Sequence, residues 1–249
     1  MYRFFVEPEQ LTGDCVTIEG KDYNHIHNVL RMRIGEEVLL SDGKGKEYLC
    51  QIEDYCIAEQ KVILSIADMF GSARELPSKI TLFQGYPKGD KLEQIVQKAV
   101  ELGVFEIVPV MMKRSVVKLD PKKADKKIER FNSIALSAAK QSKRGVIPEV
   151  KPVMNMQEAV AYAKNMDYII LPYEQAEGME YSRKIIENAK GKESIGVFIG
   201  PEGGIDISEV QMIESAGGKT ITLGHRILRT ETAGVAVLSL LMYLIEKDE

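Results

Sequence analysis

The feature that most constrains the fold is an alternation of strand and helix patterns that begins at Lys79 and continues through the rest of the chain. Short β-branched and apolar runs, typical of buried strands, alternate with stretches whose apolar residues recur every three or four positions. The strands are expected at 80–84, 106–110, 168–172, 195–200 and 219–223. Such alternation favours an α/β domain with a mainly parallel sheet.

The expected helices of this region carry start and stop signals. Asp90, Asn155 and Asp206 are each followed three residues later by a glutamate, which is the pattern of a capping box at a helix N-terminus. Glycines follow the predicted helices where a left-handed residue would close the last turn. These glycines are Gly103, Gly145, Gly191 and Gly217.

The first 70 residues have a different rhythm. Short alternating runs, separated by glycine-rich turns such as 41–45, predict a small β-barrel. Helical spacing of apolar residues between His25 and Arg33 predicts one helix that interrupts the barrel. Residues 71–78 are small and polar around Pro77, so we interpret them as a linker between a domain at 1–70 and a second domain at 79–249.

The last predicted helix, at 233–245, is apolar except at Gly234 and Ser239. A helix without a polar face is expected to be buried all round. It is shorter than the roughly 20 residues that cross a bilayer, so membrane insertion is not expected. We therefore expect it to pack on the domain core and on a second subunit, which makes the protein a homodimer.

Charge is distributed unevenly along the chain. Between Lys113 and Lys151 there are 12 Lys and Arg against four acidic residues, and the rest of the chain carries a net charge of −12 within a total of −4. A basic cluster of this kind is typical of a phosphate-binding surface. A solvated helix face explains the same pattern equally well.

Cysteine and histidine usage excludes several site classes. Cys15, Cys50 and Cys56 are odd in number and lack Cys-x-x-Cys spacing, which argues against a disulfide framework or a zinc ribbon. With three histidines in the chain, no metal site is expected. The N-terminal residues have no long apolar run, so a cytoplasmic location is the expectation.

Two predicted loops carry unusual chemistry. Residues 199–205 (IGPEGGI) follow a strand and combine three glycines with a proline, which lets backbone groups approach a ligand and holds Glu202 at the tip. Residues 223–233 (LGHRILRTETA) present Arg226, Arg229 and Glu231 before the last helix. Both loops leave the carboxyl ends of strands, where α/β domains bind ligands. Neither a Walker A motif nor a GxGxxG pattern is present, so nucleotide hydrolysis and NAD chemistry are disfavoured.

These motifs resemble the RsmE family of ribosomal-RNA methyltransferases of the SPOUT class. The resemblance includes 200–204, 223–233, 84–91 (QGYPKGDK), 98–104 (KAVELGV), 114–115, and the N-terminal segments 3–5 and 25–31, so it covers almost the whole chain. One position departs from the family, because Lys140 stands where a glutamate usually precedes Gln141.

The resemblance implies a SPOUT-type C-terminal domain with a trefoil knot and a mainly parallel sheet, and an N-terminal PUA-like β-barrel that binds RNA. It implies that S-adenosylmethionine methylates N3 of a uridine in 16S rRNA of the 30S subunit. The implied cofactor contacts are Leu171, Gly200, Gly203, Leu223, Gly224, Ile227, Leu228 and Ala233. Combined with the basic cluster, the resemblance implies RNA contacts at Arg3, Arg31, Arg33, Lys113, Arg114, Lys143 and Arg144.

Methylation at uracil N3 requires removal of a proton. Glu202 and Glu231 are candidate bases, and Arg229 is a candidate stabiliser of the uracil anion. Structural alternatives exist for each residue: Arg229 and Glu231 could form a salt bridge, and Glu202 could cap a backbone turn. Three other functions stay open, namely a ribose 2′-O-methyltransferase on tRNA or rRNA, a non-catalytic RNA-binding module and a small-molecule α/β enzyme.

Overall fold

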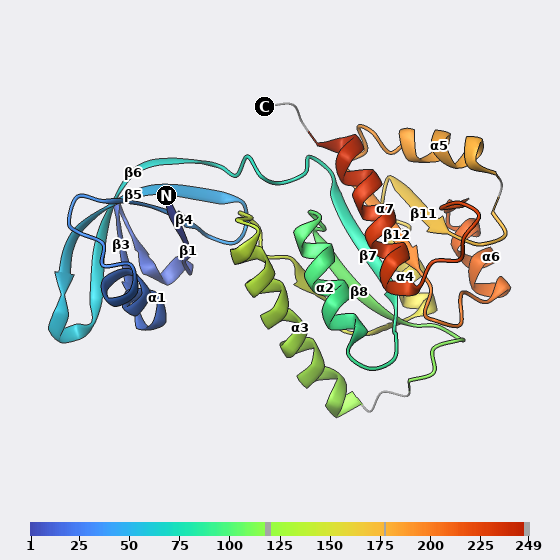
Figure 1. Ribbon diagram of the computed structural model, residues 1–249, viewed down its shortest axis with the longest axis horizontal. Coiled ribbons are helices and arrows are strands. Elements are labelled where there is room, and N and C mark those ends of the chain that lie inside the picture. Colours follow the sequence, from blue (N-terminus) through green and yellow to red (C-terminus); the bar gives the residue numbers. More distant parts are fainter. Residues whose placement is uncertain (118–120, 177, 247–249) are drawn as a thin grey trace. The chain divides into compact units, whose positions relative to one another are not determined.

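The structure is a computed structural model that describes residues 1–117, 121–176 and 178–246 (Figure 1). The chain divides into two compact units, each described below by itself. Unit 1 comprises Met1–Glu75 and Ala139–Ile147, and unit 2 comprises Leu76–Ala138 and Pro148–Glu249. The division after Glu75 falls inside the predicted linker, whose first residue, Gly71, still belongs to a strand. The inclusion of 139–147 in unit 1 was not predicted.

Unit 1 is built on one six-stranded sheet with the order β1-β4-β5-β6-β3-β2. β1 pairs with β4 in parallel and the other neighbours are antiparallel, so the sheet is mixed. The strands are β1 (Tyr2–Phe5), β2 (Leu11–Thr12), β3 (Cys15–Glu19), β4 (Glu37–Ser41), β5 (Lys46–Cys56) and β6 (Lys61–Gly71). Among the described residues no ladder joins β1 to β2, so the predicted barrel is a mixed sheet with two edges.

The predicted helix of unit 1 is present and starts earlier than expected. It consists of α1 (Gly20–Asn24), which continues into a π-helical turn, η2 (His25–Val29). Short 3-10 turns, η1 (Pro8–Gln10) and η3 (Ile57–Glu59), connect strands. Ile26, which is fully buried, packs with Phe4, Val38 and Leu64 in the core of the unit. The helical spacing therefore predicted the buried position of Ile26 correctly and that of Leu30 in part, but the expectation for Val29 is wrong, because this residue is 63% exposed.

Unit 2 is a seven-stranded, all-parallel sheet, which confirms the predicted α/β architecture. Its order is β10-β8-β7-β12-β11-β13, and β9 pairs with β8. The strands are β7 (Lys79–Gly85), β8 (Glu106–Met111), β9 (Glu149–Val150), β10 (Met154–Asn155), β11 (Tyr168–Pro172), β12 (Ser194–Ile199) and β13 (Lys219–Ile221). All five predicted strands are found, and the two two-residue strands β9 and β10 were missed.

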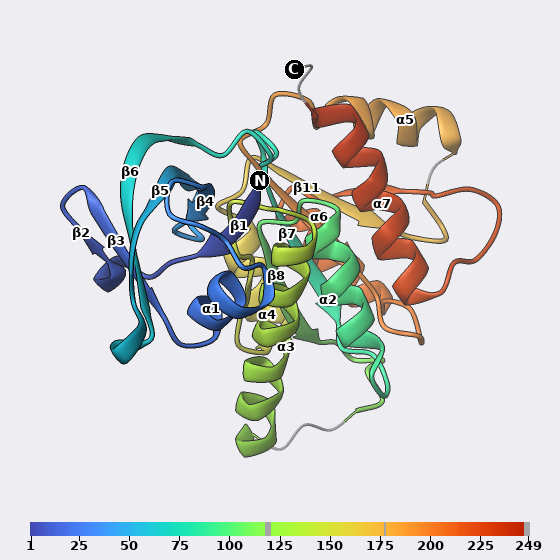
Figure 2. The same cartoon turned by 60° about the vertical axis from the view of Figure 1, so that its left-hand side comes forward.

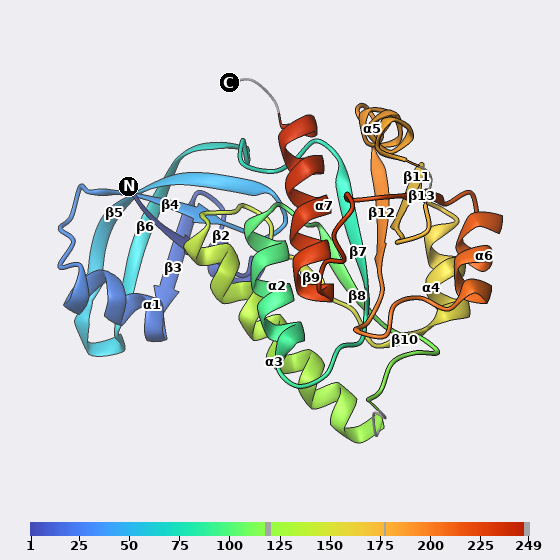
Figure 3. The same cartoon turned by 45° about the vertical axis from the view of Figure 1, so that its right-hand side comes forward.

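Helices cover both faces of this sheet, as Figures 2 and 3 show. The helices are α2 (Lys91–Glu101), α3 (Pro121–Gln141), α4 (Met156–Ala163), α5 (Met179–Glu187), α6 (Ile207–Ser215) and α7 (Thr230–Ile245). α2 packs against α7 on one face, and α4 packs against α6 on the other. The second face is filled by Phe83 and Phe198, whose rings stack 4.4 Å apart between centroids.

The helix boundaries test the predicted caps one by one. Asn155 and Asp206 both form complete capping boxes, with Glu158 and Glu209 respectively. The expected Asp90 cap is wrong: α2 begins after Asp90, but this residue has φ −95° and ψ 11°, which is not the extended conformation that lets a side chain reach back to the first turn.

Two of the four predicted glycine C-caps are confirmed: Gly103 and Gly217 directly follow the C-cap residues of α2 and α6 and have positive φ angles of 85° and 94°. Gly191 is left-handed as well (φ 79°), but the C-cap residue of α5 is Asn188, so Gly191 does not close the last turn of this helix. The prediction for Gly145 is wrong, because Lys143 takes the left-handed conformation (φ 59°) and Arg144 donates the closing hydrogen bond to the Ala139 carbonyl. Gly145 is needed for another reason: a Cβ there would lie 2.4 Å from the Ser72 side chain.

The last helix differs from its prediction. α7 begins at Thr230, and one face of it is buried through Val237, Leu238 and Leu241. The helix is therefore not buried all round as expected, since Leu240 is 49% exposed and Tyr243 is 86% exposed. Within one chain, α7 contacts α2, α5 and β12, and these contacts leave Leu240 and Tyr243 exposed.

Candidate functional site: a pocket at the carboxyl edge of the sheet

Unit 2 contains a pocket of about 840 Å³ at the carboxyl ends of three neighbouring strands. The segments that follow β11, β12 and β13 form its walls, as expected for ligand sites of open α/β sheets. The lining residues are Lys91, 172–174, Ala176, 178–179, 199–205, 222–230 and Ala233. A volume of this size lies in the range of small-molecule sites, roughly 300 to 1,000 Å³.

The loop after β12 is packed so closely that two positions require glycine, one on β7 and one in the loop itself. A Cβ on Gly85, the last residue of β7, would lie 2.6 Å from the Pro201 nitrogen, and one on Gly200 would lie 2.7 Å from the Ile205 side chain. The Gly200 carbonyl accepts a hydrogen bond of 2.6 Å from the Thr230 hydroxyl. Thr230 in turn accepts a 2.8 Å hydrogen bond from the buried amide of Gln84. The ends of β7 and β12 and the start of α7 are therefore joined through one buried hydroxyl.

Two carboxylates meet one lysine beside this loop. Lys91 Nζ lies 3.0 Å from Glu202 Oε1 and 3.5 Å from Glu231 Oε2. Glu202 also accepts hydrogen bonds from the backbone N–H of Lys88, at 3.1 and 3.4 Å. Burial acts to raise the pKa of Glu202, but hydrogen bonds from its own backbone N–H, from Lys91 and from Lys88 prevail and lower the pKa.

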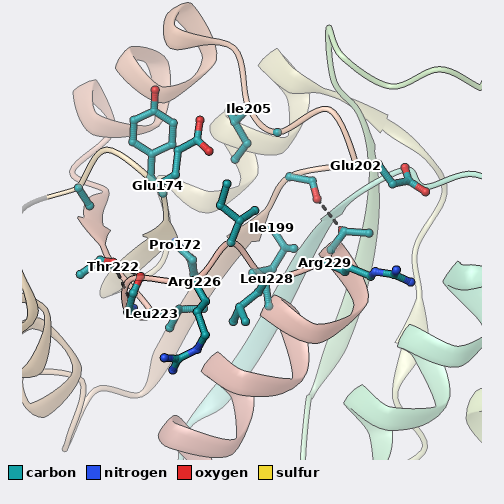
Figure 4. A pocket seen from close by; sticks show the side chains of 18 of the residues that line it. Pro172, Glu174, Ile199, Glu202, Ile205, Thr222, Leu223, Arg226, Leu228 and Arg229 are labelled. Atoms are coloured by element: carbon teal, nitrogen blue, oxygen red, sulfur yellow. Dashed lines mark hydrogen bonds between the residues drawn. The ribbon is translucent and has the colours of Figure 1, made fainter.

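Arg229 lies at the N-cap of α7 and its side chain is exposed. Figure 4 shows Glu202 and Arg229 at one end of the pocket and Arg226 at the other. Across the described ranges no ion pair joins Arg229 to Glu231, whose carboxylate is paired with Lys91. The alternative in which these two residues hold the loop by a salt bridge is therefore not what the structure shows.

Seven of the eight predicted cofactor residues line the pocket. They are Gly200, Gly203, Leu223, Gly224, Ile227, Leu228 and Ala233. Leu171 does not, because it is fully buried in the sheet core and the next residue, Pro172, forms the wall. Glu202 and Arg229 line the pocket as well, while Glu231 reaches it only through Lys91.

Sequence reasoning missed Lys91, Gln84 and Thr230. All three stand in segments that carried the family resemblance, 84–91 and 223–233, but nothing in the local pattern distinguished them from neighbouring polar residues. Their significance arises because the fold brings the ends of β7, β12 and β13 together.

The pocket fits S-adenosylmethionine by the character of its walls. Ile199, Ile205, Leu223 and Leu228 provide apolar surface, and the glycines of both loops expose backbone groups. A Cβ on Gly224 would meet no atom within 4 Å, so the pocket is open at this point. The φ angle of Gly224, 115°, also disfavours any larger residue there.

The basic residues predicted to bind RNA divide into two groups in unit 1. Arg31, Arg33 and Lys143 are exposed. The side chain of Arg3 is 8% exposed and pairs with Glu47 at 2.7 Å, and that of Arg144 is 5% exposed and pairs with Glu75 at 2.5 Å. Since a phosphate would have to displace the buried carboxylate of Glu47 or the partly buried one of Glu75, we correct the prediction and remove Arg3 and Arg144 from the RNA-contacting set.

Lys113 and Arg114 are exposed in unit 2, where both lie near Asp206. Hydrogen bonds from the Ser208 hydroxyl and backbone N–H, followed by Lys113, lower the pKa of Asp206. Arg114 also donates to the Gly203 carbonyl at 3.2 Å, next to the pocket loop. Of the basic stretch, Lys118 and Asp120 lie outside the described residues, as do the side chains of Lys122 and Lys123.

Two further findings concern the described residues only. No group of three or more His, Cys, Asp and Glu side chains among them could hold a metal ion. None of their helices is both long and apolar enough to span a bilayer.

Comparison with known families agrees with the two-unit architecture. Residues 74–242 match a family described as an RNA methyltransferase domain, and residues 18–55 match a family described as an RNA methyltransferase PUA domain. The first match includes every segment that lines the pocket.

Individual relatives are similar over nearly the whole chain. Ribosomal RNA small subunit methyltransferase E of Bacillus subtilis is 39% identical, covering 99% of this chain and 98% of the relative. A crystal structure of the protein of the same name from Neisseria gonorrhoeae, bound to S-adenosyl methionine, has a TM-score of 0.79 and 33% identity, with 98% of both chains covered. A putative methyltransferase of Legionella pneumophila, solved with bound cofactor SAM, has a TM-score of 0.77 and 31% identity and covers 97% and 96%.

Proposed function

Because the chain belongs to the family of ribosomal RNA small subunit methyltransferase E, we propose that it transfers a methyl group from S-adenosylmethionine to N3 of a uridine in 16S rRNA. The observation that carries the proposal is the glycine-lined pocket at the carboxyl edge of the sheet. Two relatives of the same fold bind S-adenosylmethionine. The loops of this pocket are the segments through which the family resemblance implies a trefoil knot.

The residues of the pocket fit the chemistry of this transfer. Bound S-adenosylmethionine supplies an electrophilic methyl group. The protein has to remove the N3 proton of uracil and to stabilise the negative charge that spreads over the carbonyl oxygens. Glu202 is the predicted base that lines the pocket, Glu231 contacts the pocket residue Lys91, and Arg229 is an exposed cation at the same end of the pocket as Glu202.

The proposal is tested by mass spectrometry of 16S rRNA from cells that lack the protein. We expect the loss of one N3-methyluridine, which returns when the parental chain is expressed and returns to a lower extent with Arg229→Ala. Unchanged rRNA in the deletion strain would refute the proposed substrate. Loss of a 2′-O-methyl group instead would favour the ribose methyltransferase.

Arg229 is proposed to act on the transition state and not on binding. Arg229→Ala should leave the affinity for S-adenosylmethionine and for RNA nearly intact and raise the barrier of single-turnover methylation by about 2 to 4 kcal/mol. Higher pH should restore part of the rate, because uracil that is already ionised needs less stabilisation. A variant that methylates at the parental rate would exclude this role.

RNA contacts are proposed for each unit separately, at the exposed Arg31, Arg33 and Lys143 of unit 1 and at the exposed Lys113 and Arg114 of unit 2. The logarithm of the RNA-binding constant falls linearly with the logarithm of the salt concentration. Replacing Arg31 and Arg33 by glutamine should make this slope shallower by about 0.7 to 0.9 for each phosphate that is no longer neutralised. An unchanged slope would assign both arginines to a solvated surface. Titrations against naked 16S rRNA and against 30S subunits would show which one the protein binds.

A cytoplasmic homodimer is part of the proposal. Leu240 and Tyr243 leave an apolar strip on α7 that a second copy could cover. Light scattering should give about twice the chain mass of 27.9 kDa, and Tyr243→Asp should shift the population towards the single chain. A parental protein of about 28 kDa at micromolar concentration would contradict the dimer.

A further inference from the structure

One lysine holds two carboxylates that come from different loops. Lys91 is the first residue of α2, Glu202 follows β12, and Glu231 is the second residue of α7. The Lys91 ammonium is 3.0 Å from Glu202 and 3.5 Å from Glu231. All three side chains are partly shielded, with exposed fractions of 34%, 26% and 24%. Such an arrangement is more than a surface ion pair, because it links three segments of the pocket edge.

The two carboxylates are not equivalent. Glu202 lines the pocket together with Lys91 and accepts hydrogen bonds from the Lys88 backbone as well. Glu231 does not line the pocket, and its Oε2 atom is buried and accepts no hydrogen bond within the described part of the chain. Its contact with Lys91 is an ion pair. Glu202 is thus the carboxylate that a uracil bound in the pocket can reach, and Glu231 contacts Lys91 without lining the pocket.

We propose that Lys91 is a positioning residue that holds Glu202 as the proton acceptor for uracil N3, while Glu231 keeps Lys91 paired after Glu202 has been protonated. The inference rests on the proposed function. With both carboxylates ionised, the cluster carries a net charge of −1, and the accepted proton brings it to zero. Without Glu231, the same proton would leave the lysine without an anionic partner and the pair with a net charge of +1, which disfavours protonation.

The proton and the methyl group move in opposite directions at N3. The N3–H bond breaks, the proton passes to a carboxylate oxygen of Glu202, and the electron pair stays on N3. That pair forms the new bond to the methyl carbon, while the pair of the breaking carbon–sulfur bond stays on sulfur. Glu202 then releases its proton to water. Lys91 exchanges no proton at any step.

Other charged groups near Glu202 are already engaged or lie elsewhere in the pocket. From the same loop, Asp206 is paired with Lys113 and Arg114. Before α2, the side chains of Lys88 and Asp90 are exposed, and neither forms an ion pair with Glu202 in the described part of the chain. From the segment before α7, Arg229 lies at the same end of the pocket, and His225 and Arg226 line it as well. Lys91 is the one cation that forms an ion pair with Glu202 among the described residues.

The first test measures carboxyl titration in the protein without RNA. Glutamate labelled with ¹³C at the side-chain carboxyl gives one signal for each residue, and Glu202→Gln and Glu231→Gln assign the two signals. Lys91→Met should raise the titration midpoint of Glu202 by about one pH unit, because an opposite charge has been removed. Glu231→Gln should lower that midpoint by roughly half a unit, because a like charge has been removed. Lys91→Arg should leave it near the parental value.

The second test measures single-turnover methylation with the same variants. Lys91→Met should slow the reaction at least tenfold at neutral pH, since a misplaced base loses its alignment, and on acidification its rate should begin to fall at a higher pH than the parental rate, because the titration midpoint of Glu202 is raised. Lys91→Arg should recover most of the rate. Lys98→Met is the matched control, because Lys98 is a lysine of the same helix that pairs with Glu101 away from the pocket, and its rate should equal the parental rate.

The results separate the two proposals. A parental protein that labels no rRNA would overturn the proposed function and with it the role of Glu202. A parental protein that labels rRNA, with midpoints and pH dependence unchanged in Lys91→Met and Glu231→Gln, would overturn the role of Lys91 alone. If Lys91→Met does not fold, the titration midpoint of Glu202 in Glu231→Gln and the methylation rate of Lys91→Arg still decide whether Lys91 has the proposed role.

Discussion

The buried hydroxyl of Thr230 offers a direct measurement of what fixes the pocket. Thr230 is 5% exposed, donates to the Gly200 carbonyl at 2.6 Å and accepts from Gln84 at 2.8 Å. Thr230→Val keeps the shape of the side chain and removes both hydrogen bonds. Each is worth about 0.5 to 1.5 kcal/mol, so the free energy of unfolding of unit 2 should fall by about 1 to 3 kcal/mol.

The matched control is Thr230→Ser, which keeps the hydroxyl and removes one methyl group. Its cost should be about 0.8 kcal/mol at most. Urea unfolding followed by circular dichroism gives the stability of both variants, and calorimetry gives their affinity for S-adenosylmethionine. Thr230→Val should also bind the cofactor more weakly than Thr230→Ser, because the 199–205 loop is no longer tied to α7. Equal stability and equal affinity of the two variants would refute the reasoning.

Three further predictions test individual side chains. Asn155→Ala should lower the free energy of unfolding by about 1 kcal/mol through loss of the α4 capping box, and an unchanged urea midpoint would show that the cap contributes nothing. Arg144→Gln should destabilise unit 1 by about 3 kcal/mol, because Glu75 loses its buried partner, whereas a stable variant with weaker RNA binding would return Arg144 to the RNA surface. Burial raises the pKa of the Cys50 thiol to about 11, so iodoacetamide at pH 8 should alkylate the exposed Cys15 and spare Cys50; peptide mass spectrometry showing equal labelling would contradict this.

Much of the fold followed from local patterns. The strands of unit 2 are buried on both faces, so each could be predicted from a continuous apolar run. Asn155 and Asp206 predicted the starts of their helices because a capping box is a contact between residues three apart. The errors arose where the conformation depends on distant contacts. Gly145 has to be a glycine because the Ser72 side chain lies against it, and the buried face of α7 is set by its contacts with α2, α5 and β12.

The site was predictable in part for the same reason. Both pocket loops stood out by composition, but the meeting of Lys91 with Glu202 and Glu231 joins residues that are 111 and 140 positions apart. The burial of Arg3 likewise depends on Glu47, a partner on another strand. The trefoil knot cannot be inferred from periodicity, because knots are almost absent among folds. It stays an expectation from the family resemblance.

The most direct test of the account is methyl transfer with purified components. The protein is incubated with S-adenosylmethionine carrying a labelled methyl group and with 30S subunits or naked 16S rRNA from a strain that lacks the protein. After digestion to nucleosides, we expect about one labelled methyl group for each 16S rRNA, found on N3 of uridine, and at most a few per cent of that amount with Arg229→Ala in the same single-turnover time. Label on a ribose 2′-oxygen, or no label with either substrate, would contradict the account.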